Sequence, residues 1–328
     1  MNTLLDSESD LRYFSGQQST SGMLLITKGR KYLIAKDPDL ARLTRFSFVP
    51  VDTTVPDAVI AMLRKLRIRK IGVRNDTISY TMVKKLEEAH IKTQDVANEI
   101  IERREIKTKQ ELSSIKKACS VADEAMRVTR ESICPGMTER ELCSIAAAEL
   151  LCGSERLSFD LIVESGENCA YAHYYPTERK IRPTDLVIVD IGACVDGYHS
   201  DLTRTFCMQP DEEKQHLYDA LLTARRIALD NIRPGRPAKG AYDAVGAFFK
   251  KRGVAGMWKY NLGHGIGLDV HEEPWFSKTS HDMLRDEMTF AIEPGLHKKG
   301  WGGMRIEDDY VLHGRPIKLT RSEYGLVP

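Results

Sequence analysis

The sequence predicts a two-domain α/β protein, in which a small N-terminal α/β domain precedes a larger C-terminal α+β domain. The chain has 328 residues, which is long for a single hydrophobic core. Residues 1–105 alternate short apolar strands with amphipathic helices, whereas residues 106–328 begin with long helices and continue with hairpins. We therefore place the domain boundary near Glu105.

The elements expected in the N-terminal domain are short. Two apolar runs, 23–27 and 32–35, are spaced as a β-hairpin, and 71–73 is predicted to be a strand between helices over 55–67 and 78–89. None of these segments carries the residue types of a reaction centre. We expect the chemistry to reside in the second domain.

The second domain is expected to open with two helices that begin at capping boxes, in which a threonine and a glutamate three residues later satisfy backbone N–H groups reciprocally. The boxes are Thr108 with Glu111 and Thr138 with Glu141. The elements expected in this domain are helices over 109–133, 139–152, 212–231 and 239–252 and a strand near 157–163.

A strong hairpin signal marks the centre of the second domain. Asp196-Gly197 lies between two runs of apolar and β-branched residues, and this dipeptide favours a two-residue hairpin because a type I′ turn needs positive φ at both central positions. In that register Asp190 lies opposite Thr203. Asp190 and Asp201 then project from one face as diagonal neighbours, roughly 7–8 Å apart at the backbone.

Two neighbouring carboxylates on a buried strand need a positive partner, because an unpaired buried charge costs several kcal/mol. A solvated outer face, or a salt bridge to one of the 48 lysines and arginines, would also satisfy them. Asp190 follows the apolar run 186–189, which is typical of a buried strand. This position favours a metal ion between Asp190 and Asp201.

The composition excludes several classes of protein. The 48 basic and 47 acidic residues are interleaved, so no basic field is available for a nucleic acid. The sequence has no apolar run of membrane-spanning length and no signal peptide. Its seven cysteines include no C-x-x-C pair, which indicates reduced thiols. We expect a cytoplasmic protein without nucleic-acid or membrane partners.

The pattern of carboxylate, turn and carboxylate recurs in a second expected hairpin, at Glu293 and Glu307. With His264, these residues and the two aspartates would offer four carboxylates and one imidazole, which suits two divalent first-row ions about 3.5–4 Å apart. Each part alone has a plainer interpretation. A lone histidine is usually structural, and the run 307–309 would ordinarily be a solvated charge cluster.

Taken together, these segments resemble the metallopeptidase family that contains Xaa-Pro dipeptidase (prolidase), aminopeptidase P and methionine aminopeptidase. The matching stretches are Asp190-Ile-Gly, Gly197-Tyr-x-x-Asp201-x-Thr-Arg-Thr, Gly263-His-Gly-Ile-Gly-x-x-x-His271-Glu-x-Pro, Glu293-Pro-Gly and Gly303-x-Arg305-Ile-Glu307-Asp. The resemblance implies a pita-bread α+β catalytic domain with a curved antiparallel sheet.

The N-terminal half fits a subgroup of this family. Ser9-Asp-Leu-Arg-Tyr-Phe-Ser-Gly16 looks like the opening of the creatinase-like domain of prolidases and aminopeptidases P. The resemblance implies a homodimer in which residues 1–105 mediate dimerisation and cover part of the neighbouring active site.

The resemblance also assigns roles to individual residues. It implies that two divalent ions are held by Asp190, Asp201, His264, Glu293 and Glu307. Manganese is favoured by the oxygen-rich ligands, with cobalt, iron or zinc as alternatives. His173 and His271 would touch the scissile peptide and stabilise the tetrahedral intermediate.

The residue types suggest how the reaction would proceed. A hydroxide bridging the ions would attack the peptide carbonyl, and Glu293 would shuttle the proton. Arg305 and Thr203 would hold metal-bound carboxylates in place. We expect His281, His297 and His313 to be surface residues.

The function implied is a two-metal peptidase that hydrolyses Xaa-Pro dipeptides. One alternative is an aminopeptidase P-like activity on longer Xaa-Pro peptides, and another is a non-catalytic pita-bread binding protein. Retention of all five ligand residues disfavours the non-catalytic alternative, and it equally disfavours a creatinase-like amidinohydrolase.

Overall fold

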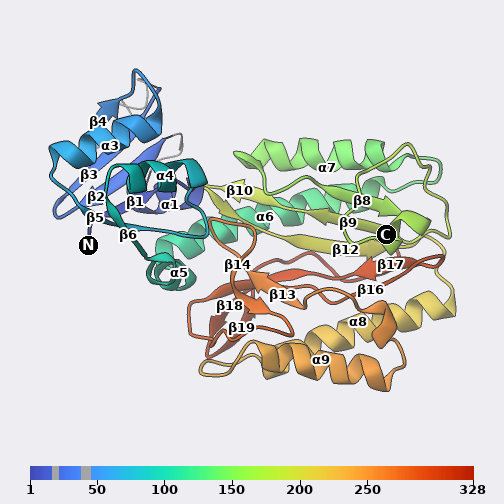
Figure 1. Cartoon of the computed structure of the whole chain (residues 1–328). Coiled ribbons are helices and arrows are strands. Elements are labelled where there is room, and N and C mark those ends of the chain that lie inside the picture. Colours follow the sequence, from blue (N-terminus) through green and yellow to red (C-terminus); the bar gives the residue numbers. More distant parts are fainter. Residues whose placement is uncertain (17–21, 38–45) are drawn as a thin grey trace. The chain divides into compact units, whose positions relative to one another are not determined.

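The computed structural model describes residues 1–16, 22–37 and 46–328. These residues form two compact units, Met1–Arg104 and Glu105–Pro328. Figure 1 shows both units, coloured along the sequence from blue at the N-terminus to red at the C-terminus. None of the helices in the described part of the chain combines the length and apolar character that crossing a membrane requires.

The first unit is built on a six-stranded sheet in the order β4-β3-β2-β1-β5-β6. Its strands are β1 (Thr3–Leu5), β2 (Met23–Thr27), β3 (Arg30–Ala35), β4 (Ser47–Pro50), β5 (Lys70–Val73) and β6 (Lys92–Asp95). Its helices are α1 (Glu8–Ser15), α3 (Val55–Lys65), α4 (Tyr80–Glu88) and α5 (Ala97–Glu105). The expected hairpin is confirmed, since β2 and β3 pair antiparallel with Thr27 opposite Arg30.

Asp10, the acidic residue of the motif at residues 9–16, belongs to a buried cluster of ion pairs. Asp10 on α1 is fully buried. Its two carboxylate oxygens accept from the guanidinium groups of Arg74 and Arg104, each at 2.9 Å. Because both arginines satisfy the buried charge, the cluster fixes α1 against the segment after β5 and the end of α5.

The second unit places two helix pairs around hairpin strands (Figure 1). The helices are α6 (Lys109–Ser132), α7 (Glu139–Gly153), α8 (Glu212–Asn231) and α9 (Lys239–Lys251). Both predicted capping boxes are present, at Thr108 with Glu111 and at Thr138 with Glu141. One core packs α6 and α7 on the strands around residues 187–206, and another packs α8 and α9 on the strands around residues 289–312.

The first predicted hairpin has the expected turn and register. Asp196 and Gly197 have φ of 50° and 76°, and Asp190 lies opposite Thr203. The strands are β9 (Val187–Ile191), β10 (Ala193–Val195), β11 (Tyr198–His199) and β12 (Leu202–Phe206). The hairpin changes sheet at Gly192, where a Cβ atom would lie 2.2 Å from the carbonyl oxygen of Ser200.

The second hairpin changes sheet in the same way. Its outer strands, β15 (Thr289–Ile292) and β18 (Asp308–His313), join a five-stranded sheet with β13 (Gly263–Gly265), β14 (Glu272–Phe276) and β19 (Arg315–Lys318). Its inner strands, β16 (Gly295–Lys298) and β17 (Gly302–Arg305), pair only with each other among the described strands. The β15–β18 ladder and the β16–β17 ladder align their cross-strand partners in the same register. Glu293 and Glu307, which lie between the two ladders, are therefore opposite each other.

The single strand expected near 157–163 is wrong. The structure has two short strands there, β7 (Arg156–Leu157) and β8 (Ile162–Ser165), which belong to different sheets. Between them, the hydroxyl of Ser158 donates to the carbonyls of Ala193 and Ser200. The chain bends between β7 and β8 because each strand pairs with a different part of the first hairpin, on either side of the point where that hairpin passes from one sheet to the other.

Candidate metal centre and active site

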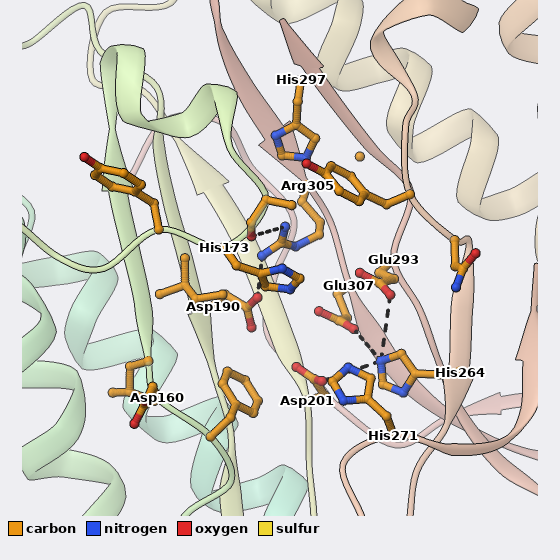
Figure 2. Close-up of a pocket in the computed structure, with 18 of the residues that line it drawn as sticks. Asp160, His173, Asp190, Asp201, His264, His271, Glu293, His297, Arg305 and Glu307 are labelled. Carbon is orange, nitrogen blue, oxygen red and sulfur yellow. Dashed lines mark hydrogen bonds and ion pairs between the residues drawn. The ribbon is translucent and has the colours of Figure 1, made fainter. Parts of the chain in front are cut away.

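Five side chains from the two hairpins and β13 converge in Figure 2. The Nε2 atom of His264 lies 3.7 Å from Asp201 and 3.8 Å from both Glu293 and Glu307, measured to the nearest carboxylate oxygens. Atoms that each bind one ion at about 2.0–2.2 Å are separated by about 3–4 Å. The spacing around His264 therefore matches ligands of a shared ion.

A second group of ligands overlaps the first. The ligand atoms of Asp190, Asp201 and Glu307 lie within 4.8 Å of one another, as do those of His264, Glu293 and Glu307. Three buried carboxylate oxygens of this set, one each on Asp190, Asp201 and Glu307, have no hydrogen-bond donor. Since an unpaired buried acceptor is costly, these oxygens fit metal ligands, and the two groups fit two divalent ions that share Glu307.

The pKa values agree with a site that requires cations. Burial, reinforced by the neighbouring carboxylates, raises the pKa of Asp201 and of Glu307 well above the usual range. Burial raises the pKa of Glu293 to about 7. Burial and the adjacent His271 lower the pKa of His264 to about 3, so its ring is neutral at pH 7. Bound cations would favour ionisation of these neighbouring carboxylates together.

Arg305 and Thr203 contact the predicted ligands. The Nη2 atom of Arg305 donates to Asp190, and its Nη1 atom donates to the carbonyl of Ala172 at 3.1 Å. The hydroxyl of Thr203 donates to Glu307 at 2.7 Å, not to the Asp190 opposite it. Both residues orient a carboxylate of the cluster.

Asp308 and Asp309 belong to the run 307–309, whose plainer interpretation was a solvated charge cluster, and the structure excludes that interpretation. Both are fully buried. Asp308 pairs with the buried Arg204 at 2.7 Å, and Asp309 accepts from the backbone N–H of Asp201 at 2.9 Å. Sequence analysis missed these roles. The apolar residues directly after them were the signal that this strand is buried.

His173 and His271 stand beside the ligand cluster (Figure 2). The ring of His271 lies 4.2 Å from that of His264 and stacks on Trp275 at 6.2 Å between centroids. Burial lowers the pKa of both His173 and His271. Each ring is therefore neutral at pH 7 and has one N–H to donate.

These residues line a cavity of about 520 Å³. Its wall includes aromatic side chains that sequence analysis did not single out: Phe159, Tyr174, Tyr175, Tyr260 and Trp275. It also includes His297, which is 1% exposed. The prediction that His297 is a surface residue is wrong, because Gly295 and Gly303 on either side of it leave room for a buried ring. His281 and His313 are exposed, as expected.

Comparison with known proteins gives matches over both units. A model described as metallopeptidase family M24 matches residues 113–313, and one described as the creatinase/prolidase N-terminal domain matches residues 2–106. An Xaa-Pro dipeptidase from Pyrococcus furiosus is 32% identical, and the match covers 96% of this chain and 92% of the relative.

Solved structures match over nearly the whole length. An Xaa-Pro dipeptidase from Bacillus anthracis has a TM-score of 0.92 and 29% identity, covering 99% of this chain and 94% of that one. An X-Pro aminopeptidase from Thermotoga maritima has a TM-score of 0.94 and 27% identity, covering 99% and 95%.

Proposed function

The chain belongs to metallopeptidase family M24 and has the pita-bread fold of the prolidases, and we propose that it hydrolyses Xaa-Pro dipeptides with two divalent metal ions. The observation that carries the proposal is the cluster of four carboxylates around His264, in which three buried oxygens have no hydrogen-bond donor. The dipeptidase relatives support the choice of an Xaa-Pro substrate.

We propose that Asp190 and Asp201 hold one ion and that His264 and Glu293 hold the other. Asp201 and Glu307 would bridge them, which is supported by the place of Glu307 in both ligand groups and by the 3.7 Å between Asp201 and the Nε2 atom of His264. The oxygen-rich set favours manganese over softer-ligand metals, and cobalt, iron and zinc are the alternatives. When bound, the ions would acidify the attacking water and polarise the peptide carbonyl.

The chain's own residues would handle the charge and the proton. His173 and His271, both neutral donors beside the cluster, would donate to the oxygen that becomes negative, a kind of interaction worth roughly 3–4 kcal/mol in other enzymes. The side chain of Glu293 is 22% exposed, against 6% for Asp201 and 2% for Glu307. Glu293 is therefore the carboxylate best placed to carry a proton from water to the leaving nitrogen.

Selectivity for proline would arise from the shape of the cavity. A proline imide has no N–H for ordinary peptide contacts, so recognition rests on packing of the ring. The aromatic wall formed by Tyr174, Tyr175 and Tyr260 offers flat apolar surface for such packing. Recognition of proline therefore does not require a residue that contacts the imide nitrogen specifically.

We further propose a cytoplasmic homodimer in which residues 1–105 mediate dimerisation and cover part of the neighbouring active site. All seven cysteines lie in the described part of the chain and are free. Free thiols support a reducing compartment.

Release of free proline from Leu-Pro by the manganese-loaded protein tests the proposal. We expect release that stops on addition of a chelator and returns with manganese, and little release of glycine from Leu-Gly as the control. No cleavage of Leu-Pro by protein with two ions bound would contradict it.

Cleavage of longer Xaa-Pro peptides is the second candidate function. The TM-score of 0.94 with an X-Pro aminopeptidase favours it. Comparing Leu-Pro with Leu-Pro-Gly separates the two candidates.

A further inference from the structure

A buried ion pair adjoins the loop that carries His271. The ammonium group of Lys107 is in hydrogen-bonding contact with Oε1 of Glu272, and the two side chains are only 2% and 9% exposed. Glu272 begins β14 and directly follows His271. The residues that line the cavity include His271 but neither member of the pair, so the pair would not meet a bound peptide.

Backbone contacts hold Lys107 on one side of the pair. Its N–H donates to the carbonyl of Glu287 at 2.9 Å. The preceding residue, Ile106, forms an antiparallel bridge with Met288, next to β15. The following residue, Thr108, caps α6. The backbone of Lys107 is therefore fixed between α6 and the five-stranded sheet, so its buried side chain can serve as an anchor.

The carboxylate of Glu272 lies on the inner side of the loop 266–271, which joins β13 to β14. Its Oε2 atom is 3.5 Å from the backbone nitrogen of Asp269. A Cβ atom at Gly267 would come within 2.5 Å of its Oε1 atom, so only a residue without a side chain leaves room for the carboxylate there. Glu272 therefore connects the inside of the loop to Lys107.

His271 is the last residue of this loop. Its ring lies 4.2 Å from that of His264 and parallel to the indole of Trp275, with an angle of 3° between the planes. Trp275 is held separately, since its N–H donates to the carboxylate of Asp282 at 2.6 Å. The path of the loop therefore decides whether the ring of His271 remains beside His264 and Trp275.

A buried ion pair is poorly explained by stability alone. Taking two charges out of water costs several kcal/mol for each ion, and replacing such a pair with apolar residues of similar volume is often neutral or stabilising. What the pair of Lys107 and Glu272 provides is a fixed geometry at the base of the loop.

We propose that Lys107 and Glu272 are positioning residues, whose ion pair holds the loop 266–271 so that the ring of His271 stays in place to donate to the developing oxyanion. The inference rests on the proposed peptidase function and refines it, because the oxyanion-stabilising histidine then depends on two residues outside the cavity. Misplacement of a catalytic group by about 1 Å can cost about 100-fold in rate, so a looser loop should be detected in kcat.

A double variant removes the pair without leaving a lone buried charge. Lys107→Met combined with Glu272→Met keeps side chains of similar length, whereas either change alone would leave its partner unpaired. With two manganese ions still bound, we expect kcat for Leu-Pro to fall by about tenfold. KM should change little, because the interaction of His271 is made in the transition state. Lys109→Met, the same change at an exposed site, should behave as wild type.

A more conservative double variant should recover part of the loss. Lys107→Met combined with Glu272→Gln also removes both charges but keeps an acceptor for the N–H of Asp269. We expect its kcat to lie between those of the wild type and the first double variant. It provides the same test if the first double variant does not fold.

A double-mutant cycle tests whether the effect passes through His271. His271→Ala alone should lower kcat by about 100–1000-fold, the usual cost of removing an oxyanion donor. Adding Lys107→Met and Glu272→Met to His271→Ala should lower kcat no further. A role in the fold alone predicts the same fractional loss with and without His271.

Trp275 offers a readout that needs no turnover. Its fluorescence in the metal-free protein is the difference between each variant and the same variant carrying Trp275→Phe. Because His271 lies parallel to this indole, release of the loop should increase quenching by acrylamide in the first double variant. Urea denaturation of the same samples checks that the fold persists.

Each outcome has a distinct meaning. A wild-type kcat in the double variants, equal fractional losses with and without His271, or loss of bound ions would each overturn the positioning role while the Xaa-Pro function stands. Absence of proline release from the wild type with two ions bound would overturn the proposed function. Increased quenching of Trp275 would then still establish the hold on the loop, and unchanged quenching would refute it.

Discussion

The two acidic hairpins supply four of the five cluster residues, but they place them differently. In the first, Asp190 faces Thr203 across the ladder, so Asp190 and Asp201 are diagonal neighbours. In the second, the shared register of the two ladders sets Glu293 directly opposite Glu307. A tight two-residue turn fixes the first register, whereas a longer connection closes the second.

The hairpins also support each other in different ways. The second hairpin contributes charged side chains to the first, since Arg305 donates to Asp190 and Asp309 accepts from the backbone N–H of Asp201. The first hairpin holds both backbone and side chains of the second, since Arg204 donates to the carbonyl of Glu307 and to the carboxylate of Asp308, and Thr203 donates to the carboxylate of Glu307, each at 2.7 Å. Neither hairpin alone supplies all of the proposed metal ligands, so changes in one should be detected at the proposed ligands of the other.

The largest effect is expected from removing a bridging charge in either hairpin. Asp201→Asn and Glu307→Gln should each lose one ion and lower turnover by more than about 100-fold. Loss of a residue that only supports a metal ligand typically costs about 10–100-fold, so loss of the ligand itself should cost more. Metal content and kcat check this. Asp196→Asn, the same chemical change at the exposed turn of the first hairpin, should behave as wild type. Two tightly bound ions and a normal rate in Asp201→Asn would refute the ligand assignment.

The support that Arg305 gives across the hairpins should be the next largest effect. Arg305→Met removes the donor to Asp190 and should weaken metal binding by about 10–100-fold. Competition with a chelator measures the affinity without relying on turnover. Arg305→Lys keeps the charge but not the planar fork, and should be intermediate. Unchanged affinity in Arg305→Met would mean that Asp190 needs no help from the second hairpin.

Asp309 should affect folding more than chemistry. Asp309→Ala leaves the buried N–H of Asp201 without an acceptor and should lower the free energy of unfolding by about 1–3 kcal/mol. Urea denaturation of the metal-free protein measures it. Asp309→Asn keeps an acceptor oxygen and should recover most of the loss. Equal stabilities for the two variants would show that the hydrogen bond to Asp201 contributes nothing.

The stability contributed by His313, at the far end of the second hairpin, should depend slightly on pH. His313, at the end of β18, is 2.8 Å from Glu287, and this hydrogen bond raises the pKa of the exposed imidazole. A pKa that is higher in the folded state stabilises the fold at pH values below the pKa of the unfolded state, which is near 6.5. This stabilisation is lost as the pH rises through the pKa of the folded state. His313→Gln should therefore lower Tm slightly at pH 5 and leave it unchanged at pH 9. A difference that grows with pH would contradict the pairing.

Local chemistry made the first hairpin predictable. Asp196-Gly197 sets the turn, the turn sets the register, and the register brings Asp190 and Asp201 to one face. The capping boxes fixed the starts of α6 and α7 for the same reason, since their partners lie three residues apart. The residue type at each proposed ligand position could also be read directly from the sequence.

Non-local packing limited the rest. The split between β7 and β8 depends on contacts of Ser158 with residues 193 and 200. Burial of Asp309 depends on its hydrogen bond to Asp201, which is 108 residues away. His297 is held in its buried position by a hydrogen bond to the carbonyl of Cys169, which is 128 residues away. No local pattern encodes those distances, so burial of a polar residue was the property most often misjudged.

Electron paramagnetic resonance of the manganese-loaded protein tests most directly whether the two hairpins hold two ions in one centre. Ions about 3.5–4 Å apart should be exchange-coupled through shared carboxylates. The cluster predicts a coupled spectrum at two equivalents of manganese, and Glu307→Gln should lose it. A spectrum of isolated ions in the fully loaded wild type would contradict the shared centre.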